Sequence, residues 1–145
     1  MREILFRGKR NDTGEWIFGS IVHQTDYYGD KCDRWFIIEG DHTNDYDIGY
    51  PIEVQKETVG QFTGLLDING AKIFEGDILT NPDYPYHTTG AIYYGRTNCS
   101  CCDGVYGFYS KEYADLRNAD ELTVIGNIYD NPEILKGAAR VAKGG

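Results

Sequence analysis

Long hydrophobic runs are missing from this 145-residue sequence. No stretch approaches the roughly 18 consecutive apolar residues that a membrane-spanning helix needs. The start of the chain is charged, and its one apolar run, Ile4–Phe6, is far too short for the apolar region of a secretory signal. We therefore expect a cytoplasmic protein with no membrane partner.

Catalytic signatures are missing as well. The sequence has no phosphate-binding loop and no dinucleotide fingerprint. His23, His42 and His87 lie in different segments, and no serine or cysteine directly neighbours any of them. We expect no catalytic residue and no cofactor, although a fold can bring distant side chains together.

Basic residues are few, because 14 Lys and Arg stand against 23 Asp and Glu and leave a formal net charge of −9. Such a charge repels nucleic acid over most of the surface, so a nucleic-acid partner is disfavoured. Acids concentrate between Asp26 and Glu53, where eight of them accompany two bases, Lys31 and Arg34. The end of the chain differs, and we expect residues 137–145 to form a loosely ordered basic tail.

The acidic segment also carries tyrosines, and aromatic side chains on a charged surface are good anchors for a protein partner. We expect residues 24–33 to form a mobile polar loop. The run from Asp41 to Asp47 is spaced like a calcium loop, but Tyr46 takes the glycine position and Ile52 the glutamate position. The candidate interaction surface consists of Tyr27, Tyr28, Asp30, Asp33, Asp41, Asp45, Tyr46 and Asp47.

Glycine and tyrosine are abundant, with 18 and 12 residues, and short β-branched and aromatic runs alternate with Gly, Asn and Asp clusters. This pattern predicts many short strands joined by turns. The fold class is therefore mostly β with a minor α+β character: a small barrel-like or multi-sheet β-domain with one or two short helices. We expect a single domain over residues 1–136. The best helix signals lie at 111–118 and after Asn131-Pro132.

Several strands can be placed from their local pattern. Residues 15–23 have apolar groups on both faces, so both faces are expected to be at least partly buried. Residues 61–66 and 72–80 are predicted to form a hairpin with a type I′ turn at Asn69-Gly70. The large aromatic side chains are expected in the core: Trp16, Phe18, Trp35, Phe62 and Phe74.

The fragment Glu75-Gly76-Asp77 interrupts the second strand of this hairpin, and Asp67 is expected across from it. Gly64, Asp67, Glu75 and Asp77 make a candidate pocket, in which paired carboxylates could do acid–base chemistry or hold a divalent metal. The alternative, which we favour, is a bulge whose carboxylates accept backbone N–H bonds.

The four cysteines are Cys32, Cys99, Cys101 and Cys102. Cys32, Cys99 and Cys101 could contribute to a zinc site. The C-x-C spacing is tighter than in the usual zinc knuckle, however, and no second pair lies at a fitting distance. Free thiols in a reducing cytoplasm are the favoured reading, so we expect no metal.

Three blocks of residues carry a resemblance to a known family. They are residues 6–10 with 14–19, residues 57–67 with 70 and 73–78, and residues 124–129 with 131–133. In this order and spacing, over residues 4–135, the chain resembles the YopX family of phage and prophage proteins. The resemblance implies a β-rich fold with a small barrel-like sheet, an origin in a mobile element and a place in a bacterial host cell. It implies no mechanism and no catalytic residue.

These observations lead to three hypotheses on function. The first is a non-catalytic accessory protein that binds a host or phage protein through its acidic, aromatic-rich surface. The alternative is a small-molecule or nucleotide-binding module at the candidate pocket, and a metal-dependent hydrolase is the least favoured. Self-association into a homo-oligomer is a further expectation, because exposed strand edges invite pairing.

Overall fold

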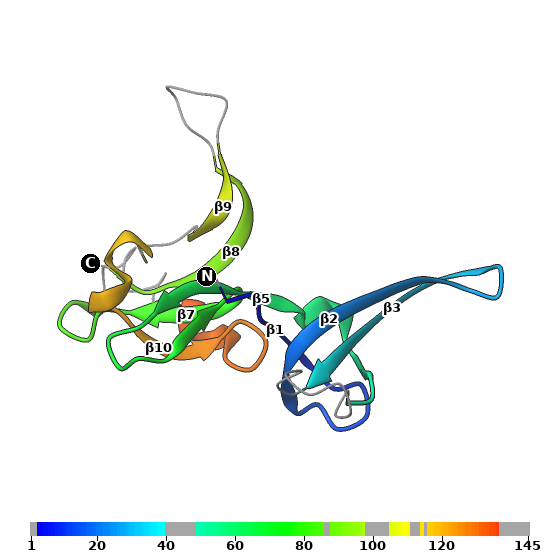
Figure 1. Ribbon diagram of the computed structural model, residues 1–145. Helices are drawn as coiled ribbons and strands as arrows, with labels where there is room; N and C mark the ends of the chain where they lie inside the picture. The colour runs from blue at the N-terminus through cyan, green and yellow to red at the C-terminus, as the bar shows by residue number, and fades with distance from the viewer. Residues whose placement is uncertain are drawn as a thin grey trace. The chain divides into compact units, whose positions relative to one another are not determined.

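The computed structural model describes residues 3–39, 49–85, 88–97, 105–110, 114 and 116–136. In this part of the chain the protein is mostly β, as the sequence predicts (Figure 1). No helix among these residues is both long and apolar enough to cross a membrane. The elements are β1 (Phe6–Lys9), β2 (Trp16–Tyr27), β3 (Asp30–Glu39), β4 (Ile52–Val54), η1 (Lys56–Thr58), β5 (Gly60–Leu66), β6 (Lys72–Phe74), β7 (Asp77–Thr80), β8 (Gly90–Thr97), β9 (Val105–Ser110), η3 (Leu116–Glu121) and β10 (Thr123–Asn127).

The strands form two antiparallel sheets. One has the order β4-β3-β2-β1-β5-β6, and the other has the order β10-β7-β8-β9. The multi-sheet form of the fold prediction is therefore confirmed, and among the described strands neither order closes into a barrel. The chain divides into two compact units, Met1–Phe62 and Thr63–Gly145, with the boundary inside β5. This division does not decide whether 1–136 is one domain, which stays a prediction, and residues 137–145 lie outside the described part.

The core of the first unit lies on one face of β2 and β3. Ile17, Ile37 and Val54 are at most 5% exposed, and Ile21 packs against them. The side chain of Phe18, the next residue after Ile17, is 45% exposed. Successive side chains of a strand point to opposite faces, so Phe18 shares its face with Trp16, which is half-buried. The second face is therefore partly buried at Trp16 and exposed from Phe18 on, and the prediction of two partly buried faces is confirmed only at the start of β2.

The prediction that five large aromatic side chains are core residues is confirmed only in part. Phe62 and Phe74 are each 4% exposed. Phe18 is on the outer face of β2 and does not belong to the core. Trp16 and Trp35 are half-buried. Trp16 carries the guanidinium of Arg7 over its ring at 4.6 Å, which is a cation–π contact and not a purely apolar environment.

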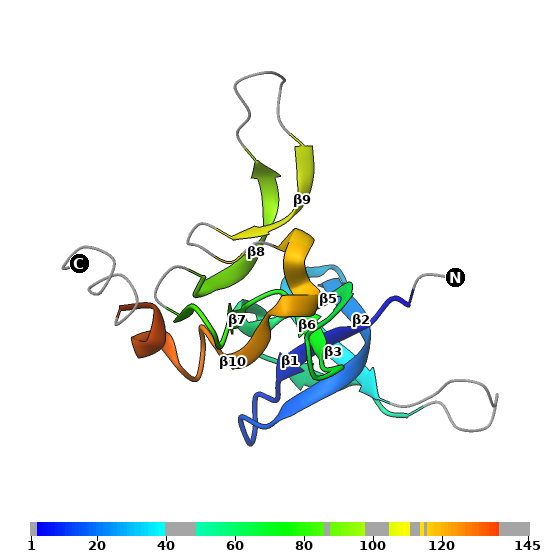
Figure 2. The same cartoon turned by 90° about the vertical axis from the view of Figure 1, so that its left-hand side faces the viewer.

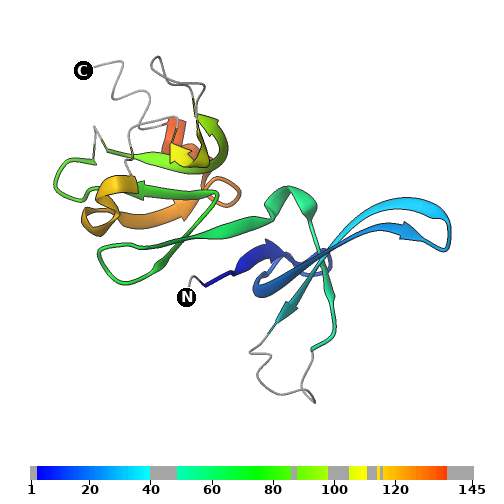
Figure 3. The ribbon, with the colours of Figure 1, turned by 45° about the horizontal axis from the view of Figure 1, so that its top comes forward.

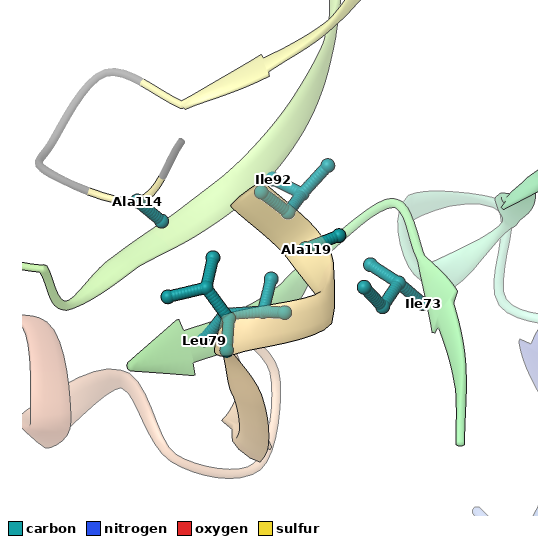
Figure 4. Packing of buried hydrophobic residues seen from close by; sticks show 6 residues of the cluster. Ile73, Leu79, Ile92, Ala114 and Ala119 are labelled. Carbon is teal, nitrogen blue, oxygen red and sulfur yellow. The ribbon is translucent and has the colours of Figure 1, made fainter. Parts of the chain in front are cut away.

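The core of the second unit lies between β7, β8 and the 3₁₀ helix η3. Figure 4 shows the side chains of Leu79, Ile92 and Ala119 converging there, with Ile73 beside them. Leu122 closes the same cluster at the start of β10. In Figure 2, strands β8 and β9 form a long hairpin next to β7.

Turns and helices differ from the sequence prediction in detail. The β5–β6 hairpin forms, but its turn is closed by hydrogen bonds from the Gly70 N–H to the Asp67 carbonyl and from the Asp67 N–H to the Ala71 carbonyl. Gly70 has a φ of 82°, whereas Asn69 is not among the residues with positive φ, so the turn is not type I′. Of the helix expected at 111–118, residues 111–113 and 115 lie outside the described residues, and residues 116–118 form the start of the 3₁₀ helix η3. The helix after Asn131-Pro132 spans residues 132–136.

Candidate functional site

The β2–β3 hairpin extends into a two-stranded arm, which we define as residues 20–34. Strand β1 pairs with β2 only from Trp16 to Gly19, and β4 pairs with β3 only from Trp35 to Ile37. Beyond these points β2 and β3 pair with each other as far as Tyr27 and Asp30. Figures 1 and 3 show the arm projecting away from β1. The prediction that residues 24–33 form a loop is therefore wrong.

The turn at the arm tip explains why residues 24–33 form a hairpin and not a loop. Tyr28 has a φ of 51° and Gly29 a φ of 89°, so both central residues of this two-residue turn are left-handed, as a type I′ hairpin requires. The Oδ1 of Asp26 accepts the N–H of Gly29 at 2.8 Å and stabilises the turn. Residues 25–31 at the outer end of the arm are exposed, and they are mostly polar. Polar strands lack the apolar alternation that marks a strand in sequence.

The arm presents two tyrosines at its tip. Tyr27 is 56% exposed and Tyr28 is 93% exposed. Their rings meet edge to face with centroids 4.6 Å apart. An edge-to-face pair restricts both rings, so a partner would meet a partly preorganised aromatic surface.

Asp33 is the centre of a polar cluster at the base of the arm. Its Oδ1 lies 2.7 Å from the Nε2 of His23 and accepts the indole N–H of Trp35 at 2.9 Å. Its Oδ2 accepts a hydrogen bond from the Nζ of Lys56 at 2.9 Å. The rings of His23 and Trp35 stack with centroids 3.8 Å apart and an angle of 11° between their planes. The bonds from Lys56, His23 and Trp35, in that order of effect, lower the pKa of Asp33 to about 2.

This cluster predicts a specific dependence of stability on pH. The pKa of Asp33 in the folded protein lies below its ordinary value of 3.8. Its contribution is therefore fully present above about pH 4 and is lost as the pH falls to about 2. We expect Asp33→Asn to flatten the fall in the free energy of unfolding over this interval, as measured by urea titrations at several pH values. The control is Asp30→Asn on the same arm. An Asp33→Asn curve parallel to that of the wild type would contradict the assignment.

A second ion pair lies on the other face of β3. The guanidinium of Arg34 donates two hydrogen bonds to the carboxylate of Glu53, at 3.1 and 2.9 Å, and its carbon lies 5.1 Å from the ring centre of Phe36. The bonds from Arg34 lower the pKa of Glu53. Two acids of the segment 26–53, Asp33 and Glu53, are thus locally neutralised.

The predicted interaction surface is placed in part by the structure. Tyr27, Tyr28 and Asp30 lie at the arm tip and Asp33 lies at its base. The other four predicted residues, Asp41, Asp45, Tyr46 and Asp47, lie outside the described part of the chain. Sequence reasoning missed His23, Trp35 and Lys56 as neighbours of Asp33. Reading Tyr28-Gly29 as a hairpin turn would have placed His23 opposite Arg34, one residue from its observed partner Trp35, because the register of the two strands shifts by one residue within the arm.

A shallow pocket of about 210 Å³ adjoins the polar cluster in the first unit. Asp33, Trp35 and Lys56 form one part of its wall. The rest comes from Asn11 and the segment 53–57, which passes from β4 into η1. The pocket therefore joins an aromatic ring to both acidic and basic groups.

The candidate pocket predicted from sequence is at a different place, in the second unit. Asp67 and Asp77 are 6% and 2% exposed. Asp67 accepts the N–H groups of Asn69 and Ala71 through Oδ1 and that of Val124 through Oδ2, at 2.8, 2.9 and 3.0 Å. Burial raises the pKa of Asp67, but these three donors outweigh burial and lower it overall.

Asp77 plays a similar part in the turn between β6 and β7. Its Oδ2 accepts the N–H of Phe74 at 2.8 Å, across a turn in which Gly76 has a φ of 92°. For Asp67 and Asp77 the reading as acceptors of backbone bonds is confirmed. The expected bulge is instead a turn, because residues 72–80 form two strands, β6 and β7, that belong to different sheets. Gly64 has a φ of 88° and is exposed, whereas Glu75 is half-buried. The use of these four residues as a pocket stays a prediction.

Cys32 is a half-buried free thiol whose Sγ lies 3.4 Å from the Gln24 carbonyl oxygen. Cys99 and Cys101 lie outside the described residues. Within 3–39, 49–85 and the later described segments, no three His, Cys, Asp or Glu side chains gather as a metal site would require.

Taken together, the fold and the site define a class: a protein of two antiparallel sheets with an aromatic-tipped arm. The family model described as "YopX protein" matches residues 5–136, and the chain belongs to this family. Among solved structures, the chain is similar to the crystal structure of protein EF1440 from Enterococcus faecalis, with 23% identity and a TM-score of 0.48. That alignment covers 93% of this chain and 99% of the other. A search of curated proteins found no match.

Proposed function

We propose that this protein is a non-catalytic interaction module of phage or prophage origin, whose arm binds a protein partner. The observation that carries the proposal is the exposure of Tyr27 and Tyr28 at the tip of a two-stranded arm. Tyrosine is enriched at protein interfaces because it offers a large apolar ring with a polar end and loses little conformational entropy on binding. The net charge of −9 favours a neutral or basic partner over nucleic acid.

The first prediction concerns capture of that partner. We expect the double variant Tyr27→Ser/Tyr28→Ser, used as tagged bait in bacterial host cells, to retain its partner about ten-fold less than the wild type. The matched control is Tyr50→Ser, because Tyr50 is also in the first unit and is 89% exposed. Quantitative mass spectrometry of the retained proteins gives the measurement. Equal enrichment by the double variant and the wild type would contradict a role for the tip.

Binding of a small polar molecule is the second candidate. The observation that favours it is the pocket of about 210 Å³ beside Trp35, which combines an aromatic wall with carboxylates and Lys56. If no protein is enriched by the wild-type bait, this function becomes the better explanation. A metal-dependent hydrolase has the least support, because Asp67 and Asp77 already use carboxylate oxygens to accept backbone N–H groups.

A further inference from the structure

The two edges of the arm differ in how well they are guarded against strand pairing. On the β3 edge, residues 30–34 carry four charged side chains in five positions: Asp30, Lys31, Asp33 and Arg34. On the β2 edge, residues 20–27 carry one charge in eight positions, Asp26. Charged side chains along an edge strand are a common protection against pairing with another strand. The β3 edge has this protection and the β2 edge lacks it.

Backbone N–H and C=O groups of β2 also point toward its unpaired edge. The Arg10 N–H donates to the Glu15 carbonyl, and the β1–β2 register pairs Gly8 with Ile17 and Phe6 with Gly19. Odd-numbered residues at the start of β2 therefore direct their N–H and C=O groups toward β1. By the same alternation Ile21 and His23 face that side, where no strand pairs with β2 beyond Gly19 in the described chain.

We propose that this edge of β2, residues 20–27, receives an extended segment of a protein partner as an added strand, and that the segment is neutral to basic. The inference rests on the proposed function and states how the partner binds. Backbone hydrogen bonds to Ile21 and His23 would supply affinity, and side chains on the two faces would supply selectivity.

Side chains on the β2 edge indicate what the segment carries. Val22 and Asp26 lie on the same face of β2, four residues apart, and Val22 is 41% exposed. An added strand would place an apolar side chain beside Val22 and, four residues along, a basic side chain beside Asp26. An acidic residue at that second position would be repelled by Asp26 and by the net charge of −9 on the chain.

The test uses the full chain and defined peptides. The probe is the acetylated, amidated peptide TKTTTVT, with its Lys and Val four residues apart. Its controls are TETTTVT, which reverses the charge, and TKTTPVT, which removes the backbone donor opposite His23. Amide shifts and hydrogen exchange are followed by NMR during titration to about 5 mM, the weak range expected of a short peptide.

We expect TKTTTVT to shift and protect the Ile21 and His23 amides, to bind about five-fold more tightly than TETTTVT, and to outcompete the proline peptide. Asp26→Asn keeps the acceptor for the Gly29 N–H and should abolish the preference for Lys over Glu. The control is Glu121→Gln in the second unit. Absence of saturable binding, equal binding of the charge-reversed peptides by the wild type, or shifts confined to other residues would overturn the proposal.

Two other outcomes distinguish partner binding at the β2 edge from self-association of the chain and from binding at the arm tip. If the Ile21 and His23 amides shift with protein concentration alone, a second copy of the chain occupies the edge, and the proposal of a partner segment is wrong. If the peptides bind as expected while the tyrosine variant retains its partner fully, the edge is a binding site and the role of the arm tip is wrong.

Discussion

Replacing Asp67 by alanine is expected to lower the free energy of unfolding by about 3 to 5 kcal/mol. The change would leave three backbone N–H groups, those of Asn69, Ala71 and Val124, without their acceptor in the second unit. A buried donor left unsatisfied costs about 1 to 3 kcal/mol, and water reaching the exposed Asn69 and Ala71 reduces the sum.

Asp67→Asn provides a graded version of the same experiment. Its carbonyl oxygen can still accept from Asn69 and Ala71, but its amide nitrogen would face the N–H of Val124. We therefore expect a loss of about half that of alanine. Urea unfolding followed by far-UV circular dichroism gives the free energies, and hydrogen exchange of the Val124 amide reports the lost bond. Asp83→Ala, an exposed position in the same unit, is the control, and an equal loss there would contradict the assignment.

A methyl group at Gly19 is expected to destabilise the first unit by about 2 to 3 kcal/mol. A Cβ built on Gly19 would lie 2.8 Å from the carbonyl carbon of Ile38 and 3.1 Å from the Cα of Glu39. Both are backbone atoms of β3, so rotation of a side chain cannot relieve the contact. Strands β2 and β3 must separate where the arm begins.

Gly107→Ala is the matched control for this change, because Gly107 is also a strand glycine and a Cβ there would meet nothing within 4 Å. We expect it to be neutral or slightly stabilising. Thermal unfolding by circular dichroism compares the two variants, and fluorescence of Trp16 and Trp35 reports the first unit alone. A Gly19→Ala melting temperature equal to that of Gly107→Ala would show that β3 adapts without cost.

Local chemistry accounts for the parts of the structure that sequence reasoning predicted correctly. Alternating short apolar runs and Gly-rich turns predicted a mostly β chain, and the motif blocks predicted the family. Asp77 was correctly read as an acceptor of backbone bonds, because its partner, the Phe74 N–H, is three residues away. Interactions over so short a distance depend little on the rest of the fold.

The sequence-based predictions were wrong where one local pattern is compatible with two structures. The polar stretch 24–33 lacks apolar alternation, yet the Asp26 side chain and the left-handed Tyr28-Gly29 pair make it a hairpin. Phe18 is apolar but alternates with the buried Ile17, so the pleat places it outside.

The sequence by itself determined the β class of this protein, its family and its acidic balance, because these depend on composition and on neighbours along the chain. Only the tertiary structure decided which side chains meet. Lys56 reaches Asp33 across 23 residues, and Asp67 reaches the Val124 N–H across 57. Backbone donors are chemically alike at every position, so strand pairing and register alone select the one that each carboxylate binds.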